Sequence, residues 1–218
     1  MKKTKPSTDI DDIYSILDST IFSKSKKKHL DDGFKKNKTI NEVLDKPTVL
    51  IIYQMMKSQI ISYVNGVVRA GKESVVFWAV SPTKDDIALK TYLVTTSSFK
   101  KRASYILGDP RFSRIKKDTR SLVYLWAKKE YQNLISCIKC GIPVAKPITV
   151  RKNVLALEFI GKNGVPEKTL VECQVNKKDY KSAILLIEQL YKKAHLVHGD
   201  FSEYNIFKTK NGFFFFFF

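Results

Sequence analysis

The feature that most constrains the fold is a short polar loop between apolar residues near the C-terminal end, over residues 195–207. Within it, Asp200 and Asn205 stand five positions apart, and Asp200 follows His198 by two. A carboxylate placed here can orient and deprotonate a hydroxyl, and the amide oxygen one turn later can bind a hard cation. Alternatively, both side chains satisfy their own backbone, as Asp and Asn often do in loops. The loop alone leaves both interpretations open.

A lysine inside an apolar strand is the second constraint. Residues 74–80 and 87–93 are rich in β-branched and aromatic residues, which predicts two strands joined by a turn. Lys90 falls within the second strand, where an ammonium is costly unless it meets an anion. Glu130 lies on the inward stripe of a helix predicted over 120–139, so we expect these two residues to pair. The alternatives are a lysine whose head reaches water and a glutamate at an exposed edge.

The glycine-containing stretch 66–73 nearly matches a Walker A loop, but Glu73 stands where that motif needs a hydroxyl to ligate magnesium. A strand-like segment follows it, whereas a Walker loop opens a helix. The sequence therefore argues against a P-loop NTPase. A strand, a glycine loop and two further strands follow the order of a kinase N-lobe, in which the loop covers nucleotide phosphates. Gly71 and Lys72 are the candidates for that contact.

Further elements complete the expected pattern. Apolar residues at helical intervals predict a helix over 48–64 with Thr48 as its cap, and a second amphipathic helix over 177–194. Residues 148–160 predict a hairpin. Gly161 then opens a hinge, and a strand that ends at such a hinge is where adenine would meet backbone amide and carbonyl groups.

The net charge of +18 and the pI of about 9.7 favour anionic partners, with RNA or nucleotide phosphates ahead of a membrane surface. We expect residues 1–47 to form a basic, largely flexible arm, which either holds RNA phosphates or is simply solvated. No apolar run approaches the length of a membrane span, and the N-terminus does not look like a signal peptide. The expected location is the cytoplasm and, as a second location, the nucleus.

Three cysteines are consistent with a reducing compartment. Cys137 and Cys140 form a C-x-x-C pair, but Cys173 is the only other thiol and no histidine pair stands at ligand spacing. A zinc site needs four ligands, so ordinary helical thiols are the preferred interpretation.

In their order along the chain, these motifs resemble the RIO family of atypical serine/threonine protein kinases, and its first subfamily best. The resemblance runs from about residue 41 to 211. It rests on several separate motifs, which are 43–45, 71–73, 87–90, 126–130, 141–143, 157–161 and 196–205. It implies a protein-kinase-like, two-lobed α+β fold with an antiparallel-sheet N-lobe and a helical C-lobe, which we expect to be incomplete here.

The resemblance also implies roles for individual residues. Lys90 would contact ATP phosphates and Glu130 would fix it, with Gly71 and Lys72 in the covering loop. Glu158 and Ile160 would present hinge backbone to adenine. Asp200 would be the catalytic carboxylate and Asn205 a ligand of Mg²⁺. The implied function is an ATP-driven kinase or ATPase in late maturation of the small ribosomal subunit, with ATP and the pre-40S particle as partners and the protein substrate unidentified.

Two positions depart from the family pattern. Arg69 and Ala70 stand where the family usually carries hydroxyl residues before the Gly-Lys-Glu motif, which makes the loop contacts to phosphate uncertain. After Asn205 the family continues into a strand that carries a second metal-binding Asp and then the rest of the C-lobe. Here the chain continues into six phenylalanines, residues 213–218, and no such Asp follows.

These observations predict four segments: the arm over 1–47, an N-lobe with its leading helix over 48–160, a partial C-lobe over 161–212, and the phenylalanine run. We expect the shortened C-lobe to bind metal weakly and to expose apolar surface. We expect the phenylalanine run to promote aggregation and to reflect a frameshift or a premature end. A second functional hypothesis follows from the missing Asp. The chain would then be a crippled pseudokinase that serves as an RNA-binding ribosome assembly protein.

Overall fold

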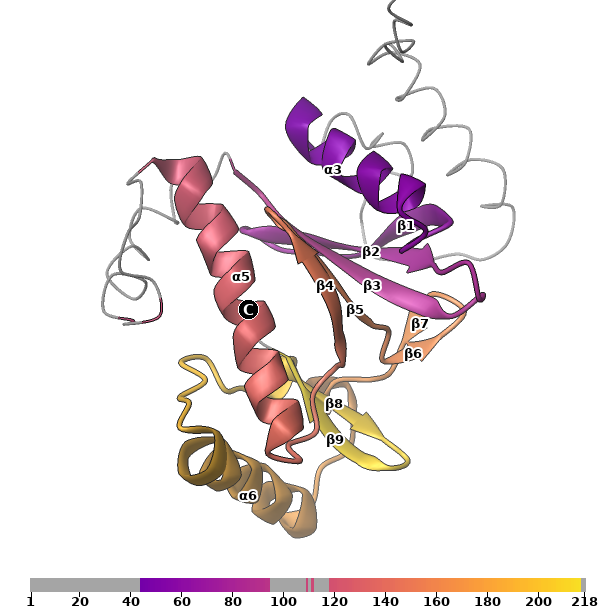
Figure 1. The fold of residues 1–218 in the computed structure, drawn as a ribbon. Coiled ribbons are helices and arrows are strands. Elements are labelled where there is room, and N and C mark those ends of the chain that lie inside the picture. The colour runs from indigo at the N-terminus through magenta and orange to yellow at the C-terminus, as the bar shows by residue number, and fades with distance from the viewer. Residues whose placement is uncertain (1–43, 95–108, 110, 112–117, 217–218) are drawn as a thin grey trace, which may run out of the picture.

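The computed structural model describes residues 44–94, 109, 111 and 118–216, and Figure 1 shows their arrangement. The predicted basic arm lies outside the described residues as far as residue 43. A five-stranded antiparallel sheet forms the upper half, in the order β1-β2-β3-β5-β4. The strands are β1 (Tyr63–Ala70), β2 (Ser74–Val80), β3 (Asp86–Tyr92), β4 (Pro147–Arg151) and β5 (Val154–Glu158). The α+β class with an antiparallel sheet is thus confirmed.

Strand alternation sorts the side chains onto two faces of this sheet. Leu89 on β3 and Ala156 on β5 face each other in register and pack in the core beneath α3 (Lys46–Lys57). Lys90 and its register partner Leu155 point the opposite way. Leu155 belongs to the core that includes residues of α5 (Thr119–Lys139) and of the C-terminal elements. The alternation therefore puts Lys90 on the face that α5 covers.

The first helix differs from the sequence prediction at both ends. Asp45, not Thr48, is the N-cap, and its side chain accepts a hydrogen bond from the backbone N–H of Thr48. Thr48 is buried, and its hydroxyl accepts a hydrogen bond from Asn153 Nδ2 at 2.8 Å. The helix ends at Lys57 rather than near residue 64, because Tyr63 begins strand β1, where it pairs with Val80 of β2. Strand pairing outweighs the helical periodicity of these residues.

Helix α5 runs beside β4 and down toward the C-terminal half, as Figure 1 shows. Its N-cap Asp118 accepts a hydrogen bond from Ser121 N–H. Arg120 in its first turn forms an ion pair with Asp45 at 2.8 Å, which ties this helix to the start of α3. The helix thus connects both halves of the described molecule.

The C-terminal half contains a second small core. Helix α6 (Lys177–Ala194) has the predicted bounds and is capped by Asn176. The other elements are β6 (Gly161–Lys162), β7 (Val165–Pro166), η2 (Leu170–Glu172), η3 (Glu203–Asn205), β8 (Ile206–Thr209) and β9 (Gly212–Phe215). No helix of the described residues is both long enough and apolar enough to cross a bilayer.

The first four residues of the phenylalanine run are packed to different degrees. Phe213 and Phe215 are buried at 9% and 1% exposure, in the core formed with Leu186 and Ile206. Phe213 to Phe215 belong to strand β9, which pairs with β8, and Phe215 also bridges to Val144. Every second phenylalanine therefore points into a core, while Phe214 and Phe216 are only partly buried. The expected exposure of C-lobe apolar surface is present on α6, where Ile184, Leu185 and Ile187 are exposed. Residues 217 and 218 lie outside the described residues.

Replacing Phe215 with alanine should lower the free energy of unfolding by about 3–5 kcal/mol, because the change leaves a cavity in a filled core. Denaturation with urea measures this loss. Phe214→Ala is the matched control, since Phe214 lies on the other face of the same strand and is only partly buried. Equal losses from the two variants would contradict the assigned orientation of β9.

Candidate functional site

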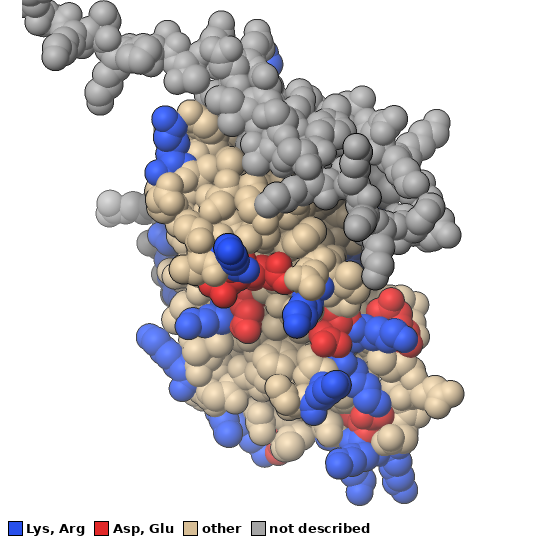
Figure 2. Space-filling view, turned by 90° about the vertical axis from the view of Figure 1, so that its right-hand side faces the viewer, with Lys and Arg blue, Asp and Glu red and all other residues tan. Residues whose placement is uncertain are grey.

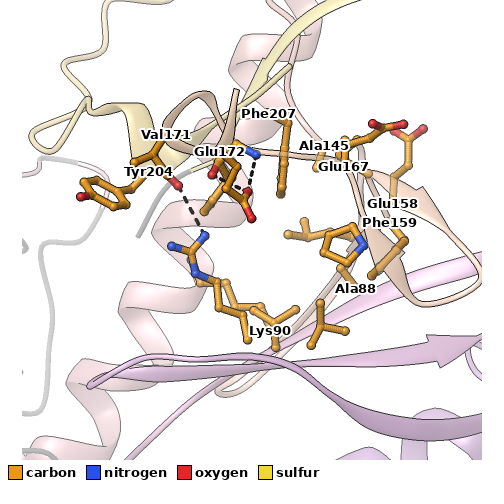
Figure 3. Close-up of a pocket in the computed structure, with 18 of the residues that line it drawn as sticks. Ala88, Lys90, Ala145, Glu158, Phe159, Glu167, Val171, Glu172, Tyr204 and Phe207 are labelled. Atoms are coloured by element: carbon orange, nitrogen blue, oxygen red, sulfur yellow. Dashed lines mark hydrogen bonds between the residues drawn. The ribbon is translucent and has the colours of Figure 1, made fainter. Parts of the chain in front are cut away.

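A cavity of about 370 Å³ lies between the five-stranded sheet and the C-terminal elements (Figure 3). Strands β1 to β3 provide one wall, η2, η3 and β8 the opposite wall, and the segment after β5 closes one end. Most lining side chains are apolar, and they include Val68, Val76, Ala88, Leu157, Phe159, Val171, Phe207 and Phe216. Ligand sites of this kind combine apolar walls with a few placed polar groups.

The predicted pair of Lys90 and Glu130 is present at the inner end of this cavity. Lys90 Nζ lies 2.8 Å from both carboxylate oxygens, and each residue is only 4% exposed. Burial raises the pKa of Glu130, whereas the ammonium of Lys90 opposes that shift by favouring the charged carboxylate. The pair fixes the Lys90 head group at the cavity wall.

Tyr92 is a third member of this group that sequence reasoning missed. Its hydroxyl donates a hydrogen bond to the same Glu130 carboxylate, and its ring lies 5.0 Å from Lys90 Nζ. The sequence contained a signal for this contact, because Lys90 and Tyr92 are two positions apart in one strand and such residues share a face. A buried tyrosine needs a partner for its hydroxyl, and Glu130 supplies it.

The segment after β5 holds the predicted hinge residues. Glu158, Phe159 and Ile160 line the cavity. The backbone N–H of Glu158 donates to the carbonyl of Lys146, and its carboxylate accepts from Lys146 N–H at 3.2 Å. The carbonyl of Ile160 accepts a hydrogen bond from Glu167 N–H at 2.9 Å. Of the Ile160 backbone groups, the N–H is therefore the one better suited to an incoming base.

The loop with Asp200 and Asn205 closes on itself at the other end of the cavity. Asn205 is buried, and its Nδ2 donates to the backbone carbonyl of Asp200 at 2.8 Å and lies 3.3 Å from Asp200 Oδ2. The Asp200 side chain is exposed and does not line the cavity, but Tyr204 beside Asn205 does. The 3₁₀ turn η3 thus brings the two predicted residues together. The amide nitrogen of Asn205 already donates its hydrogen bond to Asp200.

His198 anchors this loop to strand β9. One ring nitrogen, Nε2, lies 3.0 Å from the carbonyl of Phe216, and the ring makes edge contacts with Phe201 and Phe215 at centroid distances of 5.5 Å. Burial lowers the pKa of His198, which favours the neutral imidazole. The histidine therefore acts here as a packed support of the loop.

A magnesium site can be tested against these residues. Within the described part of the chain, no three or more His, Cys, Asp or Glu side chains gather as a metal site would require. Mg²⁺ in nucleotide sites needs only one or two protein oxygens, because phosphates and water supply the rest. The Asn205 amide oxygen could be the protein ligand of such a partial site, whereas the Asp200 carboxylate is exposed outside the cavity lining. Ligation of Mg²⁺ by Asn205 stays a prediction.

The structure does not bring Gly71 and Lys72 to the cavity. Both are exposed in the turn between β1 and β2, where Gly71 N–H donates to the carbonyl of Ser74 at 2.8 Å, and neither lines the cavity. Their contact with phosphate stays a prediction. Instead, Val68 and Arg69 of β1 face the cavity.

The Cys137 and Cys140 pair lies at the end of α5, away from this site. Cys137 is fully buried, and burial raises the pKa of its thiol to about 12. The Cys140 thiol contacts the carbonyl of Lys193 at 3.2 Å. A thiol with a raised pKa is a poor nucleophile and a poor metal ligand at neutral pH, which agrees with the interpretation as ordinary helical thiols.

Removing one partner of the buried pair should destabilise the fold far more than removing both. Glu130→Ala leaves the Lys90 ammonium buried without its carboxylate, and we expect a loss of about 3–5 kcal/mol in the free energy of unfolding. The double variant Lys90→Met with Glu130→Leu should recover most of that loss. Chemical denaturation measures both.

Glu188→Ala is the matched control, because Glu188 also pairs with a lysine, Lys192, but on the exposed surface of α6. Its removal should leave stability unchanged. An effect of Glu130→Ala no larger than that of Glu188→Ala would contradict the buried, desolvated pair.

Comparison with known proteins adds an independent line of evidence. Residues 75–217 match the family model of the RIO domain. The chain is 35% identical over 179 residues to the serine/threonine-protein kinase rio1 of Dictyostelium discoideum, covering 79% of this chain and 31% of that protein. It is 38% identical over 171 residues to the RIO-type serine/threonine-protein kinase Rio1 of Methanocaldococcus jannaschii, covering 78% and 58%.

A solved structure shares the fold. The crystal structure of the Rio2 kinase–ADP/Mg²⁺–phosphoaspartate complex from Chaetomium thermophilum superposes with a TM-score of 0.55 and 22% identity, covering 75% of this chain and 48% of that one. The chain therefore spans from about a third to three fifths of the length of these relatives. The family match covers more than half of the chain. This chain belongs to the RIO family of serine/threonine kinases, with Rio1 proteins among its most similar relatives.

Proposed function

We propose that this protein binds Mg-ATP and acts as a RIO-type serine/threonine protein kinase or ATPase. The observation that carries the proposal is the buried pair of Lys90 and Glu130 on the wall of a cavity that the hinge closes at one end and the Asp200 loop at the other. A lysine held in this way keeps its ammonium in one position, where it can donate hydrogen bonds to nucleotide phosphates. The Rio2 relative, which shares the fold, binds ADP and Mg²⁺, which supports the same ligand class here.

In this proposal, residues 48–160 form the nucleotide-binding lobe and 161–212 the partial catalytic lobe. The adenine would lie between Ala88 and Phe207, which line opposite walls (Figure 3), with the Ile160 N–H as a hydrogen-bond donor. Magnesium, when bound, would neutralise phosphate charge. The Asn205 amide oxygen would hold it. Asp200 would accept the proton of the attacking hydroxyl or orient it.

We further propose that the chain acts in late maturation of the small ribosomal subunit, in the cytoplasm, with the pre-40S particle as partner. The net charge of +18 supports an RNA-rich partner. On the face drawn in Figure 2, Lys and Arg side chains are interspersed with Asp and Glu rather than gathered in one unbroken patch. The support therefore comes from the overall charge, and the protein substrate is not identified by it.

A pseudokinase that binds RNA and assists ribosome assembly is the second candidate function. It is favoured by the same charge and by the exposed Asp200 side chain, which lies outside the cavity lining. The affinity of such a protein for RNA would fall as the salt concentration rises. Added Mg-ATP would leave that affinity unchanged. The two candidates differ in whether the wild-type chain turns over ATP.

Asp200→Asn should reduce ATP turnover by about 100-fold or more, because a positioned proton acceptor contributes that much to a transfer step. Release of phosphate from ATP, with and without a protein acceptor such as casein, measures the rate. Circular dichroism on the same sample shows whether the fold is kept.

Glu203→Gln is the matched control, since Glu203 is an exposed carboxylate in the same loop. It should leave turnover near the wild-type rate. Unchanged turnover in Asp200→Asn would contradict the catalytic role. Absence of turnover in the wild type, with RNA binding intact, would favour the pseudokinase.

A further inference from the structure

Arg69 crosses the cavity from the sheet to the C-terminal elements. It stands near the end of β1 and lines the cavity together with Lys90. Its Nη1 donates a hydrogen bond to the backbone carbonyl of Tyr204 at 3.4 Å, drawn as the dashed line to Tyr204 in Figure 3. Its guanidinium carbon lies 5.7 Å from the centre of the Phe216 ring. A long cationic side chain thus reaches over the interior of the candidate site.

The position of this cation along the cavity is informative. Figure 3 shows Tyr204 toward one end, whereas Glu158 and Phe159 lie at the other, with Lys90 between them. Tyr204 directly precedes Asn205, whose amide approaches Asp200. The guanidinium of Arg69 therefore lies at the η3 end of the cavity, beside the loop that carries Asp200 and Asn205, and not at the hinge.

The contact between Arg69 and the Tyr204 carbonyl is weak compared with what a guanidinium can make. A hydrogen bond of 3.4 Å to a neutral carbonyl is long, and the stronger geometry is a paired contact with an oxyanion. Partial desolvation at the cavity lowers the pKa of Arg69, which is otherwise exposed, and the nearby carboxylate of Glu172 opposes that shift. Glu172 itself is held on the opposite wall by the backbone N–H and hydroxyl of Thr169, both at 2.8 Å.

The anion that Arg69 could bind is defined by its neighbours. Lys90 is already neutralised by Glu130, so the pair adds little net charge to attract a polyphosphate. Arg69 is a second cation on the same cavity, always protonated at neutral pH and shaped to bind two oxygens of a phosphate. Phosphate oxygens arriving from the hinge side would meet both head groups.

We propose that Arg69 is a phosphate-binding residue of the nucleotide site. On binding of a nucleoside di- or triphosphate, its guanidinium leaves the Tyr204 carbonyl and binds the terminal phosphates. Lys90 stays paired with Glu130. The inference rests on the proposed nucleotide-binding function and adds a residue to it.

Calorimetric titration with ATP, ADP and adenosine separates a phosphate contact from an effect on cavity shape. We expect Arg69→Ala to weaken ATP and ADP binding about tenfold, corresponding to about 1.4 kcal/mol, while adenosine affinity stays unchanged. Arg69→Gln keeps most of the side-chain length but loses the charge, and should weaken ATP binding similarly. Thermal denaturation of each variant checks that the fold is kept.

Lys57→Ala is the matched control, because it removes one exposed positive charge from α3, on the opposite face of the sheet. It should leave all three affinities unchanged. Wild-type affinity for ATP in both Arg69 variants would overturn the inference and leave the proposed function standing. An equal loss of adenosine affinity would also overturn it. Failure of the wild type to bind any of the three ligands would overturn the proposed function, and the inference with it.

Discussion

The buried ion pair between Lys90 and Glu130 is the interaction on which the rest of the arrangement depends. It joins the central strand of the sheet to the middle of α5, with both head groups removed from water. Each charge is costly to bury alone and tolerable only beside the other. The pair therefore specifies how α5 lies against the sheet, with Tyr92 fixing the carboxylate from the same strand face. The cavity wall is defined by that same placement.

The two faces of the sheet have different tasks. The face beneath α3 is an apolar core with residues such as Leu89 and Phe77, and it provides stability. The opposite face carries Lys90 and Tyr92 between apolar neighbours, and it meets α5 and the cavity. Strand period therefore separates stabilising from functional side chains within a single strand, and a register shift of one residue would exchange them. The seven-residue register between β2 and β3 makes such a shift costly.

Much of the fold and of the candidate site could be predicted from the sequence. The predictions succeeded where a local sequence pattern and the energetic cost of burying a charge pointed to the same arrangement. Lys90 and Glu130 each posed the problem of a buried charge, and pairing them solved both. The bounds of α6 followed from the helical periodicity of its apolar residues. Thr48 was misassigned although the sequence held a signal against it, because Pro47 favours the first turn of a helix and therefore a cap before it, at Asp45. Arg69 was noticed only as a departure, since the direction of its side chain depends on the pairing of β1 with β2.

The phenylalanine run shows where composition misleads. Six identical apolar residues suggest an aggregating tail, yet alternation places Phe213 and Phe215 in a core that α6 and β8 provide. The sequence held the signal for strand β9 in the residues before it, because a turn around Asn211 and Gly212 connects β9 to β8. Whether an apolar run is exposed depends on whether other segments of the fold pack against it. A short stretch of sequence does not contain that information.

A crystal structure of the protein with ADP and Mg²⁺ is the measurement that tests the central claim most directly. The account predicts adenine at the hinge next to Phe159 and Ile160, phosphates within hydrogen-bond distance of Lys90, and the metal on the Asn205 amide oxygen. Nucleotide bound elsewhere on the surface, or a cavity that stays free of nucleotide at saturating ADP, would contradict it.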